Sequence, residues 1–279
     1  NANLPVEQVE LLQAMPSATI VPFAVPNKTA GLLAGGDLRR DVAELMREAF
    51  IAELRPDVVH IFSLIEGFGD DSVSSVGRRP VPYPVSVTFY DLIPLLNPEQ
   101  YLDPAPDFKR FYTRKLEYMV RADRLLAISE YAGSEAVDWL NYPSDSVSVA
   151  PLGPMQEHLQ DEPCNTRDLQ ELTKAGLQPG FVLYVGASDQ RKNLPRLVEA
   201  WSGLSSELQV AHPLVLAGWM PETDMAHLKS LAKKSAHPEN VILLGQVSDD
   251  LLRALYHSCR AFVFPSWHEG FGLPPLEAM

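Results

Sequence analysis

The chain has 279 residues, of which 46% are hydrophobic and 21% are charged, a composition that is ordinary for a soluble globular protein of one or two domains. The formal net charge of −13 argues against a nucleic-acid-binding protein, because such proteins carry basic surfaces that neutralise phosphates. No apolar run is long enough to span a bilayer, no signal peptide is visible, and Cys164 and Cys259 fit no metal or disulfide pattern. We therefore expect a cytoplasmic protein.

Strands and helices alternate through the first half of the chain. A short helix is expected over 4–15, and Asp37 is expected to cap a helix that runs to about Leu54. The apolar residues of that helix share one face, namely Leu38, Val42, Leu45, Met46, Ala49 and Phe50. Further helices are predicted over 106–121 and from the Ser129 cap to Leu140. The predicted strands are 18–23, 57–62, 84–89, 124–128 and 146–150.

The segment Pro151-Leu152-Gly153-Pro154 interrupts this alternation and predicts a boundary between domains 1–152 and 153–279. The predicted strands of the second domain are 181–185, 213–217, 241–244 and 261–264. Its predicted helices are 167–175, 194–203, 222–235 and 248–258. The pattern predicts an α/β protein with two Rossmann-like domains, each a mostly parallel sheet covered on both faces, that face each other across a cleft. Ligands of such sheets bind beyond the carboxyl ends of the strands.

The last eleven residues carry the strongest functional signal. The predicted strand 261–264 is closed by Pro265 and Ser266 and leads to Glu269-Gly270-Phe271-Gly272-Leu273 and then to the start of a helix. Seven residues separate Glu269 from Glu277. Glycines let a backbone approach a ligand closely, and a strand-loop-helix unit directs free N–H groups toward an anion. Carboxylates beside such a site accept hydrogen bonds from sugar hydroxyls. Two carboxylates that flank one anion site predict a ligand with a central diphosphate and a sugar at each end, which is a nucleotide-sugar.

This segment resembles the E-x7-E signature of the retaining glycosyltransferases of family 4, which have the GT-B fold. The resemblance implies that Glu269 holds the donor hexose and Glu277 the ribose hydroxyls, while N–H groups of Gly270, Phe271, Gly272 and Leu273 bind the phosphate oxygens. The alternative interpretation is a strand-helix turn whose two glutamates are only solvated.

A second motif follows the strand at 181–185. Gly186 begins a loop in which Arg191 and Lys192 precede a helix that Asn193 is expected to cap. Cations at a helix start are unfavourable unless an anion is near, and fixed cations would stabilise a leaving diphosphate. Lys192 matches the phosphate-binding lysine of the resembled family, whereas Ala187 stands where many members have arginine. The alternative is a basic pair on the surface.

Three weaker signals lie at other strand ends. Tyr90 and Asp91 resemble the H-D-x-x-P segment of the family's acceptor domain, with tyrosine in place of histidine; the alternative for Asp91 is a turn carboxylate. The retaining mechanism that the resemblance implies needs no protein nucleophile, because the leaving phosphate deprotonates the acceptor. Gln246 and Val247 stand where the family contacts the nucleobase. Trp219 is expected either beside the base or in the core.

The run Lys109–Lys115 is basic and aromatic in an otherwise acidic chain. It fits either a packed amphipathic helix with solvated charges or a surface that contacts anionic lipid near a lipid-linked acceptor. The second alternative would place the protein at the inner face of the membrane. We find no carboxylate pair suited to a divalent metal and therefore expect no metal and no cofactor.

We therefore predict a retaining, metal-independent hexosyltransferase. It would use a nucleoside diphosphate sugar such as GDP-mannose and a saccharide or lipid-linked acceptor in surface polysaccharide synthesis. The chain begins with Asn1 and ends early in a helix, so we expect a fragment that is incomplete at both ends. Two alternatives stay open: a non-catalytic GT-B module that binds sugar nucleotides, and a sugar-nucleotide epimerase of the same fold. The sequence does not specify the sugar, the base, the acceptor, the linkage or the oligomeric state.

Overall fold

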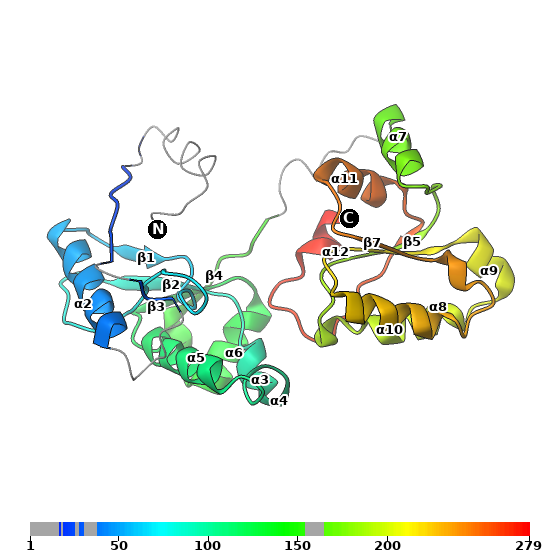
Figure 1. Ribbon diagram of the computed structural model, residues 1–279. Coiled ribbons are helices and arrows are strands. Elements are labelled where there is room, and N and C mark those ends of the chain that lie inside the picture. The colour runs from blue at the N-terminus through cyan, green and yellow to red at the C-terminus, as the bar shows by residue number, and fades with distance from the viewer. Residues whose placement is uncertain (1–16, 18, 26–27, 31–37, 154–164) are drawn as a thin grey trace. The chain divides into compact units, whose positions relative to one another are not determined.

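The computed structural model describes residues 17, 19–25, 28–30, 38–153 and 165–279. The chain divides into two compact units, Asn1–Pro151 and Leu152–Met279 (Figure 1). Among the described residues, each unit contains a parallel four-stranded sheet with helices packed against it, which confirms the predicted α/β class. The helix predicted over 4–15 lies outside the described residues. The strand predicted over 18–23 is wrong for its described part, since residues 19–23 form no strand.

The sheet of the first unit has the order β1-β2-β3-β4. Its strands are β1 Val59–Ile61, β2 Val85–Phe89, β3 Arg124–Ala127 and β4 Val147–Val149. Its helices are α2 Leu38–Glu53, α3 Ile93–Leu96, α4 Pro98–Tyr101, α5 Pro106–Met119 and α6 Glu130–Leu140, with a 3-10 turn at Ser144–Ser146. Ser129 caps α6 as predicted, because its hydroxyl accepts a hydrogen bond from Ala132 N–H at 3.0 Å.

The two faces of this sheet are buried to different degrees. Alternate residues of β2 are fully buried, whereas Ser86 and Thr88 on the opposite face are half-buried. His60 of β1 lies on the half-buried face, where its Nδ1 and Nε2 are hydrogen-bonded to Ser86 Oγ at 2.8 Å and Thr88 Oγ1 at 2.9 Å. Among the described residues, polar cross-strand pairs therefore occupy one face of this sheet and apolar side chains the other.

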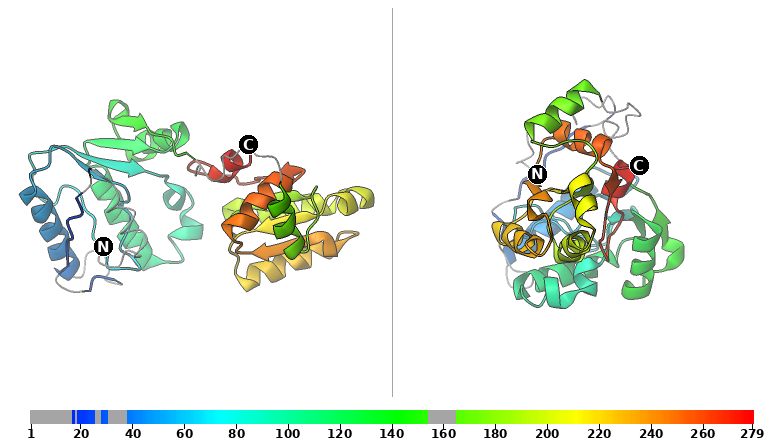
Figure 2. Two further views of the ribbon diagram at one scale, coloured as in Figure 1. Left: turned by 90° about the horizontal axis from the view of Figure 1, so that it is seen from above. Right: turned by 90° about the vertical axis from the view of Figure 1, so that its right-hand side faces the viewer.

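The sheet of the second unit has the order β7-β6-β5-β8. Its strands are β5 Val182–Val185, β6 Leu214–Ala217, β7 Val241–Gly245 and β8 Ala261–Phe262. Its helices are α7 Thr166–Lys174, α8 Leu194–Ser202, α9 Ser206–Ala211, α10 Glu222–Ala232, α11 Asp249–Ser258 and α12 Leu273–Glu277, with 3-10 turns at Gln190–Lys192 and Pro238–Asn240. In this unit α7 and α11 lie on one side of the sheet, and α8 and α10 lie on the other (Figures 1 and 2).

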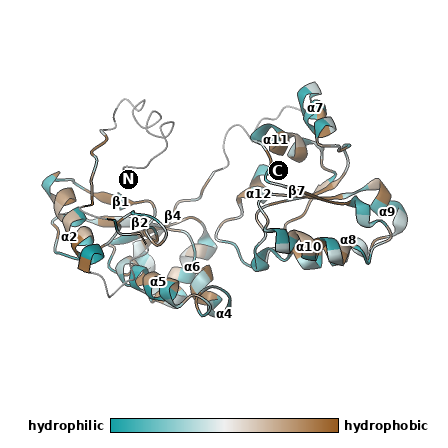
Figure 3. Cartoon of the chain, in the orientation of Figure 1, coloured by the Kyte–Doolittle hydropathy of each residue, from teal (hydrophilic) through white to brown (hydrophobic). Residues whose placement is uncertain are grey.

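Two apolar clusters sandwich the second sheet. Leu214 and Leu216 of β6 pack with residues of α8 and α10, and Val215 and Ala217 pack with residues of α7 and α11. Figure 3 shows the hydrophobic colouring along β7 of the same sheet. A parallel strand that is buried on both faces reads as a continuous apolar run, which is why the sequence located these strands well. This rigid sheet carries the loops in which the motif residues lie.

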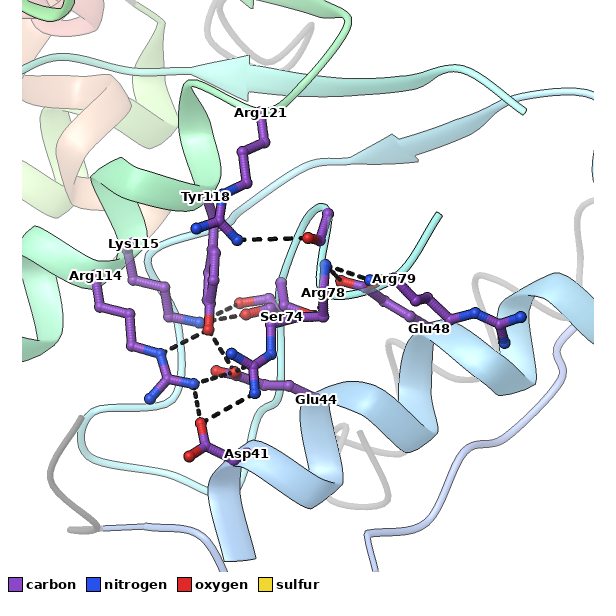
Figure 4. Close-up of polar contacts among 12 residues, drawn as sticks. Asp41, Glu44, Glu48, Ser74, Arg78, Arg79, Arg114, Lys115, Tyr118 and Arg121 are labelled. Atoms are coloured by element: carbon purple, nitrogen blue, oxygen red, sulfur yellow. Dashed lines mark hydrogen bonds and ion pairs between the residues drawn. The ribbon is translucent and has the colours of Figure 1, made fainter. Parts of the chain in front are cut away.

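Helix α2 buries the face that its sequence pattern places outside. Leu38 is 76% exposed, whereas Arg40, Glu44 and Glu48 are buried. Glu44 Oε2 accepts hydrogen bonds from Arg114 Nη2 and Tyr118 Oη of α5, each at 2.7 Å (Figure 4). The apolar residues of α2 therefore do not mark its buried face. The charged face can be buried because partners distant in the chain form hydrogen bonds with its carboxylates.

Candidate functional site

Glycines bring the carboxyl ends of β5, β6 and β7 together. Gly186 N–H donates to Ala217 O at 2.9 Å, and Gly218 N–H donates to Gly245 O at 2.8 Å. Gly218 has φ +130°, and a Cβ there would lie 2.1 Å from the Gly186 carbonyl oxygen. No side chain fits at that distance, so glycine is required. The loop 186–193 thus begins in close backbone contact with the end of β6.

Two hydrogen bonds join the loop after β5 to the loop after β8. Asn193, at φ +60°, stands at the start of α8 as predicted, but its side chain makes no capping bond. Its Nδ2 instead donates to Pro265 O at 3.2 Å. Trp267 N–H donates to Arg191 O at 3.0 Å. These two bonds join the loop that carries the predicted cations to the loop that carries the first motif glutamate.

Glu269 bridges the two predicted cations. Its Oε2 lies 3.0 Å from Arg191 Nη1, and its Oε1 lies 2.6 Å from Lys192 Nζ. The side chains of Glu269, Arg191 and Lys192 are 22%, 22% and 11% exposed, so water screens these charges less than it screens fully exposed pairs. Lys192 Nζ also lies 4.9 Å from the centroid of the Phe264 ring. The anion that the sequence pattern required beside the cations is thus present within the chain itself.

Tyr184 of β5 supports this charged group and was not predicted to be part of it. Its ring stacks on Phe264 with centroids 6.1 Å apart, and its Oη donates to Ala187 O at 3.1 Å. Burial, followed by the negative charge of Glu269, raises the pKa of the Tyr184 phenol, so it stays protonated at neutral pH. In the sequence this residue looks like an ordinary buried strand position, and no local signal marks its hydroxyl.

The second motif glutamate lies at the end of the short helix α12. Gly272, at φ +92°, precedes that helix, Gly270 is buried, and Phe271 and Leu273 are half-buried. Glu277 Oε2 accepts a hydrogen bond from Tyr256 Oη of α11 at 2.8 Å. Burial, followed by that bond to the carboxylate, raises the pKa of Tyr256. The two glutamates of the motif are therefore held in different ways, one by cations and the other by a phenol.

The predicted nucleobase residues follow neighbouring strands. Gln246 and Val247 come directly after β7, and Trp219 follows β6, which pairs with β7. Trp219 is 61% exposed, which excludes the buried structural role that the sequence left open. Because the carboxyl ends of parallel strands share one edge of a sheet, these residues lie on the same edge as Gly186 and the cations.

Tyr90 and Asp91 belong to the first unit, at the end of β2. Tyr90 is 44% exposed. Asp91 Oδ1 accepts a hydrogen bond from Ile93 N–H at 3.0 Å, and Glu135 Oε2 of α6 accepts one from Leu92 N–H at 2.8 Å. The structure thus supports the interpretation of Asp91 as a turn carboxylate, since its carboxylate accepts a backbone hydrogen bond at the start of α3.

The basic run of α5 is divided between solvent and interior. Lys109 and Arg110 are about half exposed and pair with nearby aspartates. Arg114 is 14% exposed, and Lys115 donates to Ser74 Oγ at 2.8 Å from a buried position (Figure 4). This division favours the packed amphipathic helix over a continuous lipid-binding surface.

Among the described residues, no group of three or more His, Cys, Asp or Glu side chains could hold a metal ion. In the part of the chain that the structure describes, no helix has both the length and the apolar character needed to cross a membrane.

The part of the chain that carries the charged loops matches a known protein family. Residues 167–279 match the family described as Glycosyl transferases group 1. The chain is 38% identical over 251 residues to the serotype-specific mannosyltransferase WbdA of Escherichia coli, covering 86% of this chain and 30% of that protein. It is 32% identical over 193 residues to the O-antigen chain mannosyltransferase B of Escherichia coli, covering 69% of this chain and 49% of that protein. The chain thus spans between 30% and 49% of the length of these two relatives.

Solved structures share the fold. WaaG, a glycosyltransferase involved in lipopolysaccharide biosynthesis, superposes with a TM-score of 0.62 at 15% identity, over 93% of this chain and 67% of that chain. HepE of Anabaena, in complex with UDP-glucose, superposes with a TM-score of 0.55 at 17% identity, over 70% of this chain and 50% of that chain. The two parallel-sheet units therefore have the GT-B fold of glycosyltransferases, as predicted.

Proposed function

We propose that the protein is a retaining, metal-independent glycosyltransferase of surface polysaccharide synthesis. It transfers a hexose, which we assign as mannose, from a nucleoside diphosphate sugar such as GDP-mannose to a saccharide or lipid-linked acceptor. The observation that carries the proposal is the arrangement of Glu269 between Arg191 and Lys192, with Glu277 eight positions further along. The two mannosyltransferase relatives support the choice of sugar.

Each element of the site has a role in the proposed reaction. Arg191 and Lys192 bind the diphosphate and stabilise the charge that it gains as its bond to the sugar breaks. Glu269 accepts hydrogen bonds from the donor hexose, and Glu277 accepts them from the ribose. The N–H groups of Gly270–Leu273 contact phosphate oxygens, the bare backbone at Gly186 lets the diphosphate approach, and Gln246 and Val247 contact the base.

The proposed chemistry needs no protein nucleophile. The bond between the anomeric carbon and the diphosphate oxygen breaks, and the acceptor oxygen bonds to the same face of the sugar. The acceptor proton passes to the departing phosphate oxygen. We assign Tyr90 the role of a hydrogen-bond donor to the acceptor, and Asp91 shapes the turn beside it.

A transfer assay tests the proposal. Radiolabelled GDP-mannose is incubated with a mannose oligosaccharide, and the anomeric configuration of the product is read by NMR. We expect transfer with retention, and Glu269→Ala should reduce the rate by about two orders of magnitude or more. Glu171→Ala is the matched control, because Glu171 pairs with Lys174 at 2.6 Å on α7, outside the site. GDP-mannose binding without turnover would contradict the enzyme and favour the non-catalytic binding module.

A further inference from the structure

Glu277, the second glutamate of the motif, is hydrogen-bonded to a residue of another helix. It belongs to α12 Leu273–Glu277, whereas its partner belongs to α11. The carboxylate is half-buried, and its Oε2 accepts the hydrogen bond from Tyr256 Oη at 2.8 Å. The direction of the carboxylate therefore depends on a residue of another helix.

Tyr256 is firmly anchored. It belongs to α11, which spans Asp249–Ser258 and is capped by Ser248. The tyrosine is 9% exposed and is part of the apolar cluster between α7, α11 and the sheet. Its ring contacts Phe262 of β8 at a centroid distance of 5.8 Å, and Phe262 stacks on Phe264 at 6.1 Å. Phe264 is the ring over which Lys192 lies. One row of aromatic rings thus underlies both Glu277 and the cations.

The phenol is suited to orient a carboxylate without neutralising it. Burial and the neighbouring Glu277 raise the pKa of Tyr256, so the phenol remains a neutral donor. A carboxylate offers about four lone-pair positions, and the phenol occupies one of them. The remaining positions, including those of Oε1, stay available for two further donors. Neighbouring hydroxyls of a ribose supply two donors on one side of a five-membered ring, which matches a carboxylate held in one plane.

We propose that Tyr256 is a positioning residue, which holds Glu277 in the orientation that binds the 2′- and 3′-hydroxyls of the nucleotide ribose. The inference rests on the proposed function, because it takes Glu277 as the ribose contact. It adds that recognition of the ribose depends on a buried phenol in α11. If the role of Tyr256 were only structural, its bond to Glu277 would simply hold α12 against α11. Its loss would then weaken the binding of ribose and dideoxyribose ligands equally.

The test compares ribose and dideoxyribose ligands. Calorimetry measures the dissociation constants of GDP and of 2′,3′-dideoxyguanosine diphosphate for the unaltered chain, Tyr256→Phe, Glu277→Gln and the double variant. If the unaltered chain binds UDP more tightly than GDP, UDP and 2′,3′-dideoxyuridine diphosphate are used in place of the two guanosine ligands. We expect Tyr256→Phe to weaken GDP binding about tenfold and to change dideoxy binding less than about twofold. In the Glu277→Gln background, Tyr256→Phe should have almost no further effect on GDP binding.

Tyr142→Phe is the matched control, because Tyr142 is 4% exposed and its Oη donates to Ala122 O at 2.6 Å in the first unit. It should lower the melting temperature without changing the affinity for either ligand. Equal losses for GDP and the dideoxy analogue in Tyr256→Phe would show a structural clamp and overturn the inference, as would unchanged GDP binding. If the unaltered chain binds no nucleoside diphosphate at all, the proposed function itself fails, which is a distinct outcome.

Discussion

Replacing Glu269 by glutamine should strengthen the binding of a bare nucleoside diphosphate. The Glu269 carboxylate already pairs with both cations, at 3.0 Å from Arg191 Nη1 and 2.6 Å from Lys192 Nζ. A diphosphate that binds the same cations must first displace it. The glutamine side chain has nearly the same shape but no charge, so it competes less.

The magnitude follows from the exposure of the pairs. With side chains 11% to 22% exposed, each pair is worth more than a surface salt bridge, which contributes at most about 1 kcal/mol, and less than a fully buried one. The amide oxygen keeps part of the interaction. We therefore expect a net gain of about 1 kcal/mol for the ligand, which is roughly a fivefold lower dissociation constant. The gain should shrink at high salt, because screening weakens the competing ion pairs.

Isothermal titration of GDP and GDP-mannose into the unaltered chain and Glu269→Gln measures the effect. GDP should bind more tightly to the variant, whereas the extra affinity that the mannose provides should fall, because Glu269 is its proposed contact. Glu171→Gln, which alters the exposed pair with Lys174, should change neither affinity. Weaker GDP binding by Glu269→Gln would refute the reasoning, because it would show that the carboxylate positions the cations and does not compete with the ligand.

Further predictions concern the scaffold. Gly218→Ala should destabilise the second unit by about 2–4 kcal/mol in chemical denaturation and abolish nucleotide binding, because the new Cβ would meet the Gly186 carbonyl oxygen. Gly69→Ala is the control and should be tolerated, because a Cβ at Gly69 would lie in open space. Burial lowers the pKa of Lys115 to about 7, so the unfolded chain binds more protons between pH 7 and about 10.5. Stability should therefore rise with pH across that range, and Lys115→Met should reduce the slope. Burial alone would raise the pKa of Asp168, but hydrogen bonds from Asn165 and His257 outweigh it and lower the pKa. The Asp168 carboxylate should therefore contribute to stability above about pH 4, and this contribution should be lost as the pH falls through the lowered value. Asp168→Asn should remove this acid dependence in thermal melts.

The sequence predicted most strands of both sheets and the loops that carry the site. Strands such as β6, buried on both faces, are continuous apolar runs bounded by glycine or proline, and that signal is local. The face of α2 could not be predicted, because Glu44 finds its partners Arg114 and Tyr118 70 and 74 residues away. A helical stripe alone carries no information about such distant partners.

Partners that are distant in the sequence also limited the prediction of the site. Arg191 and Lys192 read as cations that need an external anion, yet Glu269 lies 78 and 77 residues further along the chain and contacts both. The E-x7-E spacing identified Glu269 and Glu277 because both glutamates belong to one local segment. Tyr184 and Tyr256 were missed because a buried tyrosine in a strand or helix looks like core, and only the fold shows where its hydroxyl points.

The measurement that tests the proposed site most directly is the stabilisation of this chain by UDP, GDP, ADP and dTDP in thermal melts, repeated with Lys192→Met and Glu277→Ala. A ligand at about a hundred times its dissociation constant should add about 2.7 kcal/mol to the free energy of unfolding. We predict that one nucleotide, GDP, stabilises the unaltered chain and that each variant loses most of the effect, while Glu171→Ala keeps it. The absence of stabilisation by all four nucleotides, or full stabilisation of both variants, would contradict the assignment of this loop cluster as a nucleotide-sugar site.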